Sequence, residues 1–161
     1  KSRIVTCLPK DSLKIDQDCH VINSVYSESF KKWLWIDPTF NAYVMNEKGE
    51  MLSIEEVRER LISDKTLILN PDANWNNKTS QTKEEYLQNY MAKNLYMLEC
   101  PASSEYNMET SSEGKTYNYI RLLPLDYHEQ KPDIEEEKRT GQNTTWNTYK
   151  TNNPIVFWGL Q

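Results

Sequence analysis

His20 and Asp37 are of the residue types that do acid–base chemistry as a pair. A histidine hydrogen-bonded to a carboxylate is the orienting half of a nucleophile–base–acid triad, in which the carboxylate fixes the ring and the imidazole moves the proton. Both residue types are common, and a hairpin can align them by chance. Geometry rather than co-occurrence identifies such a site, so the elements that position the two residues decide the matter.

A β-hairpin is the element predicted around these two residues. Residues 19–26 and 33–37 are rich in β-branched and aromatic side chains, and the polar residues 27–32 separate them. With a turn centred on residues 28 and 29, antiparallel pairing places His20 directly opposite Asp37. Directly opposed side chains share a face, with Cβ atoms about 4.5–5.5 Å apart. We therefore expect a side-chain hydrogen bond of about 2.6–3.2 Å between them, which a one-residue slip of register would abolish.

Two segments of the hairpin resemble the core of the transglutaminase-like superfamily. They are CHVINSVY at residues 19–26 and KWLWIDPTF at residues 32–40. That family has a strand that opens with the catalytic histidine, followed by a strand with Trp before Asp-Pro-Thr. The strand that precedes the histidine often begins with an arginine, here Arg3. The resemblance covers about residues 1 to 62 and implies that His20 is the general base and Asp37 its partner.

The nucleophilic cysteine of that family begins a helix upstream of the arginine-bearing strand. The printed sequence starts at Lys1, already within that strand, so we expect a fragment or processed chain that starts after the nucleophile and is inactive alone. Cys7 is followed by Leu-Pro-Lys-Asp, which is no helix start. Cys19 neighbours His20, and successive strand residues point to opposite faces. We expect both thiols to be buried and structural.

The resemblance implies thiol-dependent acyl transfer on a peptide or protein amide, by a peptidase, an amidase or a transglutaminase. Hydrolysis and cross-linking both remain open, with a slight preference for hydrolysis. No metal or organic cofactor is implied. The alternative is a transglutaminase-like module without catalysis that serves binding or structure. Without the cysteine-bearing helix, the apolar surface of the sheet against which that helix packs would be exposed. Such a surface would favour self-association or retention of an N-terminal piece of the same protein.

Composition narrows the class of protein. The chain has 161 residues, 11% aromatic residues and a net charge of −5, which suits a folded acidic domain and argues against a nucleic-acid partner. No apolar run approaches the roughly 20 residues of a membrane span. A zinc site from the three cysteines and His20 is conceivable, but its ligand spacing (Cys7, Cys19, His20, Cys100) is unlike known patterns. The cellular compartment stays open, an extracytoplasmic one included.

The predicted fold is α+β: an antiparallel sheet with helices, in a single domain of residues 1–161. Residues 1–62 would be the transglutaminase-like core portion and residues 63–161 a β-rich, family-specific extension. The other expected strands are at 2–8, 66–70, 95–100 and 116–125, with a strand continuing through 40–44 and a closing strand or docking tail at 154–160. Residues 71–81 are expected to be a loop, and the acidic segment 130–148 a solvated loop or mobile segment. Two helices are expected, capped by Ser53 and Thr82, with apolar stripes of Ile54, Val57, Leu61 and Ile62 in the first and Tyr86, Leu87, Tyr90 and Met91 in the second. His128 is expected to be exposed and without a role.

Overall fold

A computed structural model describes residues 1–10, 18–103, 114–124, 135–141 and 144–159. The described residues form a mixed α+β structure with a mostly antiparallel sheet, as predicted, in two compact units, Lys1–Leu95 and Tyr96–Gln161. We call these the first and second unit. No described helix has the length and apolar character needed to cross a membrane.

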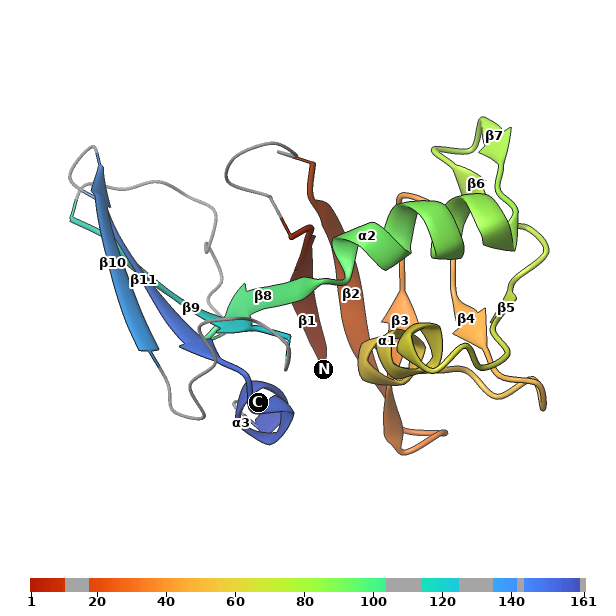
Figure 1. The fold of residues 1–161 in the computed structure, drawn as a ribbon, viewed down its shortest axis with the longest axis horizontal. Helices are drawn as coiled ribbons and strands as arrows, with labels where there is room; N and C mark the ends of the chain where they lie inside the picture. Colours follow the sequence, from red (N-terminus) through yellow and green to blue (C-terminus); the bar gives the residue numbers. More distant parts are fainter. Residues whose placement is uncertain (11–17, 104–113, 125–134, 142–143, 160–161) are drawn as a thin grey trace. The chain divides into compact units, whose positions relative to one another are not determined.

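The first unit is built on three antiparallel strands in sequence order: β1 (Ser2–Leu8), β2 (His20–Ser27) and β3 (Lys32–Ile36) (Figure 1). Alternation assigns the side chains to two faces. The buried inner face carries Val5, Cys7, His20, Ile22, Ser24 and Trp35. The outer face carries Ile4 and Val21, which are about half exposed at 46% and 44%. His20 therefore lies on the buried face of the sheet, and Asp37 lies just beyond the end of β3.

The β2–β3 register differs from the prediction by two residues. The last pair is Ser27 with Lys32, which leaves a four-residue connection rather than a two-residue turn. In this connection the backbone N–H of Phe30 donates to Ser27 Oγ, and Lys31 takes a left-handed conformation with φ of 53°. Short polar side chains that bond to the backbone two or three residues away favour such turns. A shift of two preserves the side on which every residue points.

The strand expected to continue through residue 44 is interrupted instead. Residues 38–41 form a turn closed by a bridge between Asp37 and Ala42, and Asn41 has φ of 44°. Pro38 has a fixed φ that suits the second position of a turn, which favours a turn directly after Asp37. The Asp37 side chain accepts backbone N–H groups of the turn, as aspartate often does. The next strand is the short β4 (Val44–Met45), which pairs with β5 (Ile68–Leu69).

Helix α1 (Ile54–Ile62) begins as predicted. Ser53 and Glu56 form a capping box, in which each side chain accepts the other residue's backbone N–H. Ile54 and Val57 are buried, but Ile62 is 75% exposed and does not belong to the apolar face as expected. The loop predicted at 71–81 contains a small hairpin, β6 (Asn74–Trp75) with β7 (Thr79–Ser80), whose turn residues Asn76 and Asn77 have positive φ.

The second predicted helix is present as a π-helix, η1 (Glu84–Met91), followed by one turn of α2 (Ala92–Asn94). Thr82 and Glu85 form the predicted capping box. The π-helix has i→i+5 hydrogen bonds, and such segments occur frequently at functional sites. Its buried side chains are Tyr86, Leu87 and Met91, and Tyr86 contacts the inner face of the sheet through Trp35 and Asp37.

The second unit contains strands in the order β10–β11–β9–β8: β8 (Met97–Pro101), β9 (Thr116–Leu122), β10 (Glu135–Gly141) and β11 (Thr144–Thr151). The predicted antiparallel hairpin of β8 and β9 is confirmed, and β11 runs parallel to β9. Two predictions are wrong here. The described residues of 130–148 include strand β10 and part of β11 rather than a loop, and the segment expected as a closing strand or docking tail forms helix α3 (Pro154–Gly159), not a strand. Proline suits the first helical position, and Asn153 caps it by accepting the N–H of Ile155.

The first unit extends through Leu95 and so includes residues on both sides of position 62. The single-domain organisation and a transglutaminase-like core portion stay predictions. His128 and most of the polar segment at 102–115 lie outside the described residues.

Candidate functional site

The His20 and Asp37 side chains meet as predicted. His20 Nε2 lies 2.6 Å from Asp37 Oδ2, and both residues are buried, at 6% and 0% exposed. Asp37 follows the last ladder pair, Asn23 with Ile36, so it approaches His20 diagonally rather than from the opposite position. The contact survives the register error because a two-residue shift keeps both side chains on one face.

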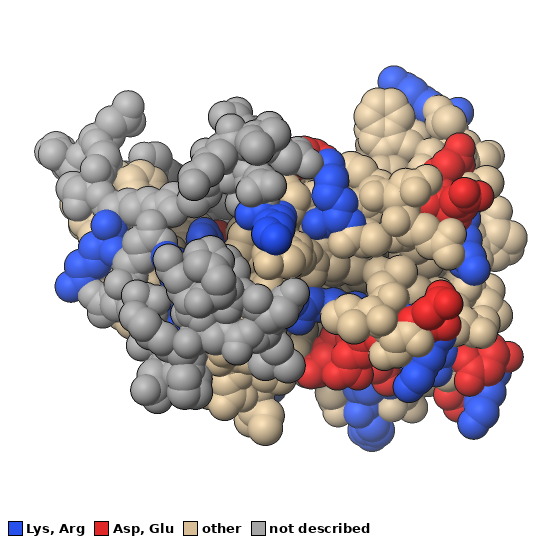
Figure 2. Space-filling model, in the orientation of Figure 1, with Lys and Arg blue, Asp and Glu red and all other residues tan. Residues whose placement is uncertain are grey.

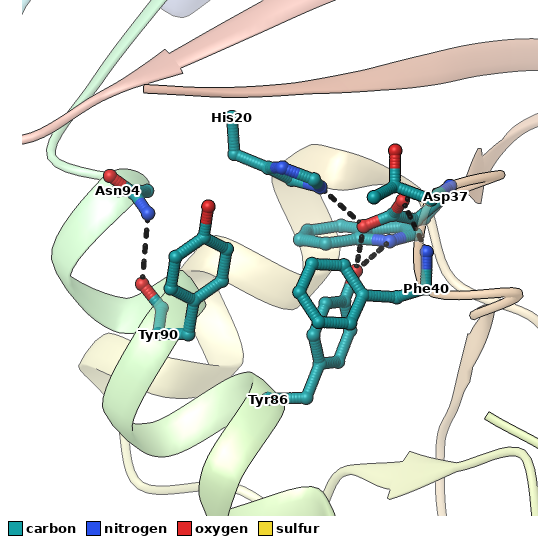
Figure 3. Close-up of polar contacts among 8 residues, drawn as sticks. His20, Asp37, Phe40, Tyr86, Tyr90 and Asn94 are labelled. Atoms are coloured by element: carbon teal, nitrogen blue, oxygen red, sulfur yellow. Dashed lines mark hydrogen bonds and ion pairs between the residues drawn. The ribbon is translucent and has the colours of Figure 1, made fainter. Parts of the chain in front are cut away.

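Asp37 is held by donors on both oxygens (Figure 3). Its Oδ1 accepts the backbone N–H groups of Thr39 at 3.0 Å and Phe40 at 3.1 Å. Its Oδ2 accepts the Tyr86 hydroxyl at 2.6 Å and contacts His20 Nε2. An ionised carboxylate only accepts hydrogen bonds and has about four lone-pair positions. This arrangement therefore compensates a buried negative charge at Asp37.

The surroundings of Asp37 define the tautomer of His20. Because the carboxylate accepts, Nε2 must carry the proton and donate it. In the neutral imidazole the other nitrogen, Nδ1, is then an unprotonated acceptor. None of the hydrogen bonds among the described residues uses Nδ1. The ring thus offers a basic nitrogen with no partner in the described part of the chain.

Aromatic rings hold the imidazole in place. Phe40 and Tyr90 each lie edge-to-face with the His20 ring, at centroid distances of 5.3 and 5.4 Å. Figure 3 shows Tyr90 from the π-helix on one side of His20 and Phe40 on the Asp37 side. Edge-to-face packing is a favoured geometry for such rings. Together with Asp37, these contacts restrict ring rotation and keep Nδ1 in one direction.

Tyr86 is a site residue that the sequence reasoning missed, because it was assigned only to an apolar helix stripe. Trp35 Nε1 donates to the Tyr86 hydroxyl at 3.2 Å, and that hydroxyl donates to Asp37. Burial, and then the charge of Asp37, raise the pKa of Tyr86 well above its ordinary value, so it remains a donor. The one available signal is general: a buried tyrosine usually finds a hydrogen-bond partner. Nothing in the sequence names Asp37 as that partner.

The two thiols nearest in sequence to His20 have different environments. Cys7 is directly opposite His20 in the β1–β2 ladder and is fully buried. Burial, and next the charge of Asp37, raise its pKa far above the ordinary range, so it stays a neutral thiol. Cys19 is exposed, which contradicts the expectation that it is buried. It precedes β2 rather than lying within a covered strand.

Among the residues that the structure describes, no cluster of His, Cys, Asp or Glu is suited to hold a metal ion. Searches of protein-family models, curated proteins and solved structures give no match to this chain. The site's chemistry must therefore be argued from its own geometry. That geometry comprises an oriented imidazole, a compensated carboxylate and an unprotonated nitrogen ready to take a proton.

Proposed function

We propose that this chain carries the base-bearing part of a transglutaminase-like site for thiol-dependent acyl transfer on amides. The observation that carries the proposal is the buried 2.6 Å contact of His20 Nε2 with Asp37 Oδ2, which leaves Nδ1 as the proton acceptor. His20 would be the general base, and Asp37 would hold its tautomer and stabilise the imidazolium that forms.

The local structure gives a physical reason for the Asp-Pro-Thr segment that carries the family resemblance. Asp37 ends the paired strand, Pro38 starts the turn, and the N–H groups of Thr39 and Phe40 return to the carboxylate. The segment thus supplies both the acid and two of its donors. This supports the proposal because the acid of a triad must stay ionised and fixed in place, and these backbone donors favour both.

The proposed reaction has two stages. A thiol beside Nδ1 gives its proton to that nitrogen, and the sulfur attacks the amide carbonyl carbon. The carbon–nitrogen bond then breaks, and the imidazolium returns the proton to the leaving amine. The thioester is next attacked by water, which gives hydrolysis, or by an amine, which gives a new amide. His20 takes the proton of the attacking group in each case and returns it to the thiol.

We propose that the thiol is not one of the three cysteines of these 161 residues. Cys7 is buried, and its pKa is raised. Cys19 immediately precedes His20, and neighbouring residues of an extended chain project to opposite sides. In proteins of the proposed family the thiol begins a helix, where its pKa falls. We therefore expect the 161-residue chain alone to be inactive, because nucleophile and base act as a unit.

The test compares the 161-residue chain with a longer polypeptide that includes the flanking coding sequence. Each is assayed for ammonia release from a glutamine peptide, for hydroxamate formation with hydroxylamine, and for peptide hydrolysis. Activity is expected only in the longer polypeptide, with His20→Ala and Asp37→Asn each lowering kcat by about 10³-fold or more. Lys78→Gln is the control, at an exposed residue of the β6–β7 hairpin.

Three results would contradict the proposal. One is activity that survives His20→Ala, and another is activity of the 161-residue chain after all three cysteines are replaced by alanine. The third is a longer polypeptide that folds, contains a helix-starting cysteine and remains inactive on every amide. That last result would favour the module without catalysis.

A further inference from the structure

A second candidate site lies in the first unit, at residues that take no part in the His20–Asp37 network. A hollow of about 470 Å³ is bounded by the end of α1, the segment after it, and η1. Small-molecule sites usually have volumes of about 300–1,000 Å³. The hollow is therefore large enough for a compact ligand.

The charges that line this hollow are mainly positive. Arg60, Lys65 and Lys83 contribute cations, and Asp64 is the one carboxylate among its described lining residues. Neither lysine makes an ion pair with another described residue. The chain as a whole is acidic, with a net charge of −5, and Figure 2 shows acidic and basic side chains interspersed around α1 on the face drawn. With Asp64 as the one described carboxylate and no ion pair between either lysine and a described residue, the hollow has a small local excess of positive charge.

Helix capping does not account for these cations. The C-terminal carbonyls of α1 already accept backbone donors: Ser63 N–H bonds to the carbonyl of Glu59, and Lys65 N–H to that of Arg60. The Arg60 guanidinium is engaged by Glu47 and by the Thr66 carbonyl, which fixes it at the wall. Arg60 thus has a structural role, whereas Lys65 and Lys83 keep their donor capacity.

The rest of the lining is mixed: Thr66 and Gln88 are polar, and the other four side chains are apolar. Leu61 is half-buried, Leu67 and Leu87 are buried, and Ala92 completes the wall from α2. Leu67 and Leu87 are 5% and 0% exposed, so Leu61 and Ala92 are the apolar side chains that a ligand can contact while its charged group reaches the two ammonium groups. Apolar walls with a few placed polar groups are typical of small-molecule sites.

We propose that this hollow binds a small amphiphilic anion, whose carboxylate or phosphate group contacts Lys65 and Lys83 and whose apolar portion lies against Leu61 and Ala92. Each lysine contributes a charge-assisted hydrogen bond to the anionic oxygen atoms. The apolar wall adds affinity that a bare anion lacks. The site is independent of acyl transfer and requires no thiol.

The experiment measures binding to the 161-residue chain by calorimetry and by backbone amide shifts around residues 60–67 and 83–88. The probes are octyl phosphate, octanoate, octyl glucoside and inorganic phosphate, below micellar concentrations. We expect both octyl anions to bind, and the neutral glucoside to bind at least about fivefold more weakly. Inorganic phosphate should bind at least about tenfold more weakly than octyl phosphate because it buries no apolar surface. The two octyl anions together show which head group is preferred.

Exposed lysines permit clean variants. Lys65→Gln and Lys83→Gln should each weaken octyl phosphate binding about two- to fivefold, and the double variant about tenfold. Lys78→Gln should leave it unchanged. The proposal is overturned if the double variant binds as tightly as the original chain, if octyl glucoside binds as well as the anions, or if inorganic phosphate matches octyl phosphate.

Discussion

Among the described residues, each unit has a largely buried contact between a carboxylate and a nitrogen-bearing side chain, and the two contacts differ in whether a proton acceptor remains on the nitrogen-bearing group. In the second unit, Arg121 Nε and Nη2 both donate to Glu99 Oε2, at 2.9 and 2.6 Å. In the first unit, His20 Nε2 donates to Asp37, and Nδ1 has no described hydrogen bond. Arginine stays protonated and has no acceptor atom, whereas neutral imidazole has one.

The two pairs also reach their positions differently. Glu99 and Arg121 are direct partners in the β8–β9 ladder, so strand register alone brings them together. Asp37 lies beyond its ladder and is positioned by its own turn and by Tyr86. A cross-strand pair is a common element of sheet stabilisation. The Asp37 carboxylate needs four donors to be held in place, more than strand register alone supplies. It lies beside a ring that can accept a proton, which the Glu99–Arg121 pair does not offer.

The largest change in stability should follow Asp37→Ala. That substitution leaves the buried donors of Tyr86, His20, Thr39 and Phe40 without their acceptor. A buried donor left without its acceptor costs about 1–3 kcal/mol, and four donors lose their acceptor here, so we expect a loss of about 3–5 kcal/mol. Urea unfolding followed by tryptophan fluorescence measures the loss. A loss below about 1 kcal/mol would mean that Asp37 does not organise the site.

Glu99→Leu should destabilise the second unit less, by about 2–3 kcal/mol, because the Arg121 and Glu99 side chains are 10% and 17% exposed and retain some solvent contact. Combining it with Arg121→Leu should return the stability to within about 1 kcal/mol of the original, since no unpaired charge remains. The same urea experiment, run on both single variants and the double variant, gives the comparison. A double variant no better than Glu99→Leu would show that the pair is not a closed structural unit.

Tyr86→Phe keeps the ring and removes one donor from Asp37, so we expect a loss of about 1–2 kcal/mol near neutral pH. The substitution should also change how the stability of the fold depends on pH in the alkaline range. The folded-state pKa of Tyr86 is raised by burial and by Asp37, so its contribution is complete below the ordinary tyrosine pKa of about 10 and is lost as pH rises above it. Unfolding midpoints between neutral pH and pH 11 should fall less steeply in the variant. Tyr43→Phe, at a partly exposed ring outside the site, is the matched control.

The smallest effect should follow Glu56→Gln in α1. Burial alone would raise the pKa of Glu56, but hydrogen bonds from Lys32 and Ser53 lower it below its ordinary value. Its contribution is therefore present at neutral pH and lost as pH falls below about 4. The side chain is 41% exposed, so solvent screening keeps the effect below about 1 kcal/mol. Stability at pH 7 and pH 3 should differ less in the variant, and an unchanged difference would contradict this assignment.

The sequence predicted the contact between His20 and Asp37 but not the hydrogen bonds that hold Asp37 in place. Alternation in residues 19–26 and 33–37 established the face of His20 and Asp37, and that property is insensitive to a two-residue error in register. The turn at 38–41 and the partnership with Tyr86 depend on non-local hydrogen bonds, which a periodic pattern does not encode. The π-helical phase of Tyr86 and Tyr90 also differs from the 3.6-residue pattern used to predict the helix.

The second unit shows a different limit. The charged segment at 133–138 led to the prediction of a solvated loop. The β-branched threonines of β11, which favour a strand, were outweighed by this charge (Thr144, Thr145, Thr148 and Thr151). Strand β11 is stabilised by pairing with both β9 and β10. This long-range pairing outweighs local composition, so β11 cannot be predicted from its own residues alone.

The most direct test of the central claim is the tautomer of His20. Two-bond proton–nitrogen correlation spectra of the chain, labelled with ¹⁵N in its two histidines, distinguish protonated from unprotonated ring nitrogens. His20→Gln assigns the signals. At alkaline pH, where the imidazole is neutral, we predict the proton on Nε2 and none on Nδ1, with Asp37→Asn releasing this preference. A proton on Nδ1, or an unbiased mixture of tautomers in the original chain, would contradict the account.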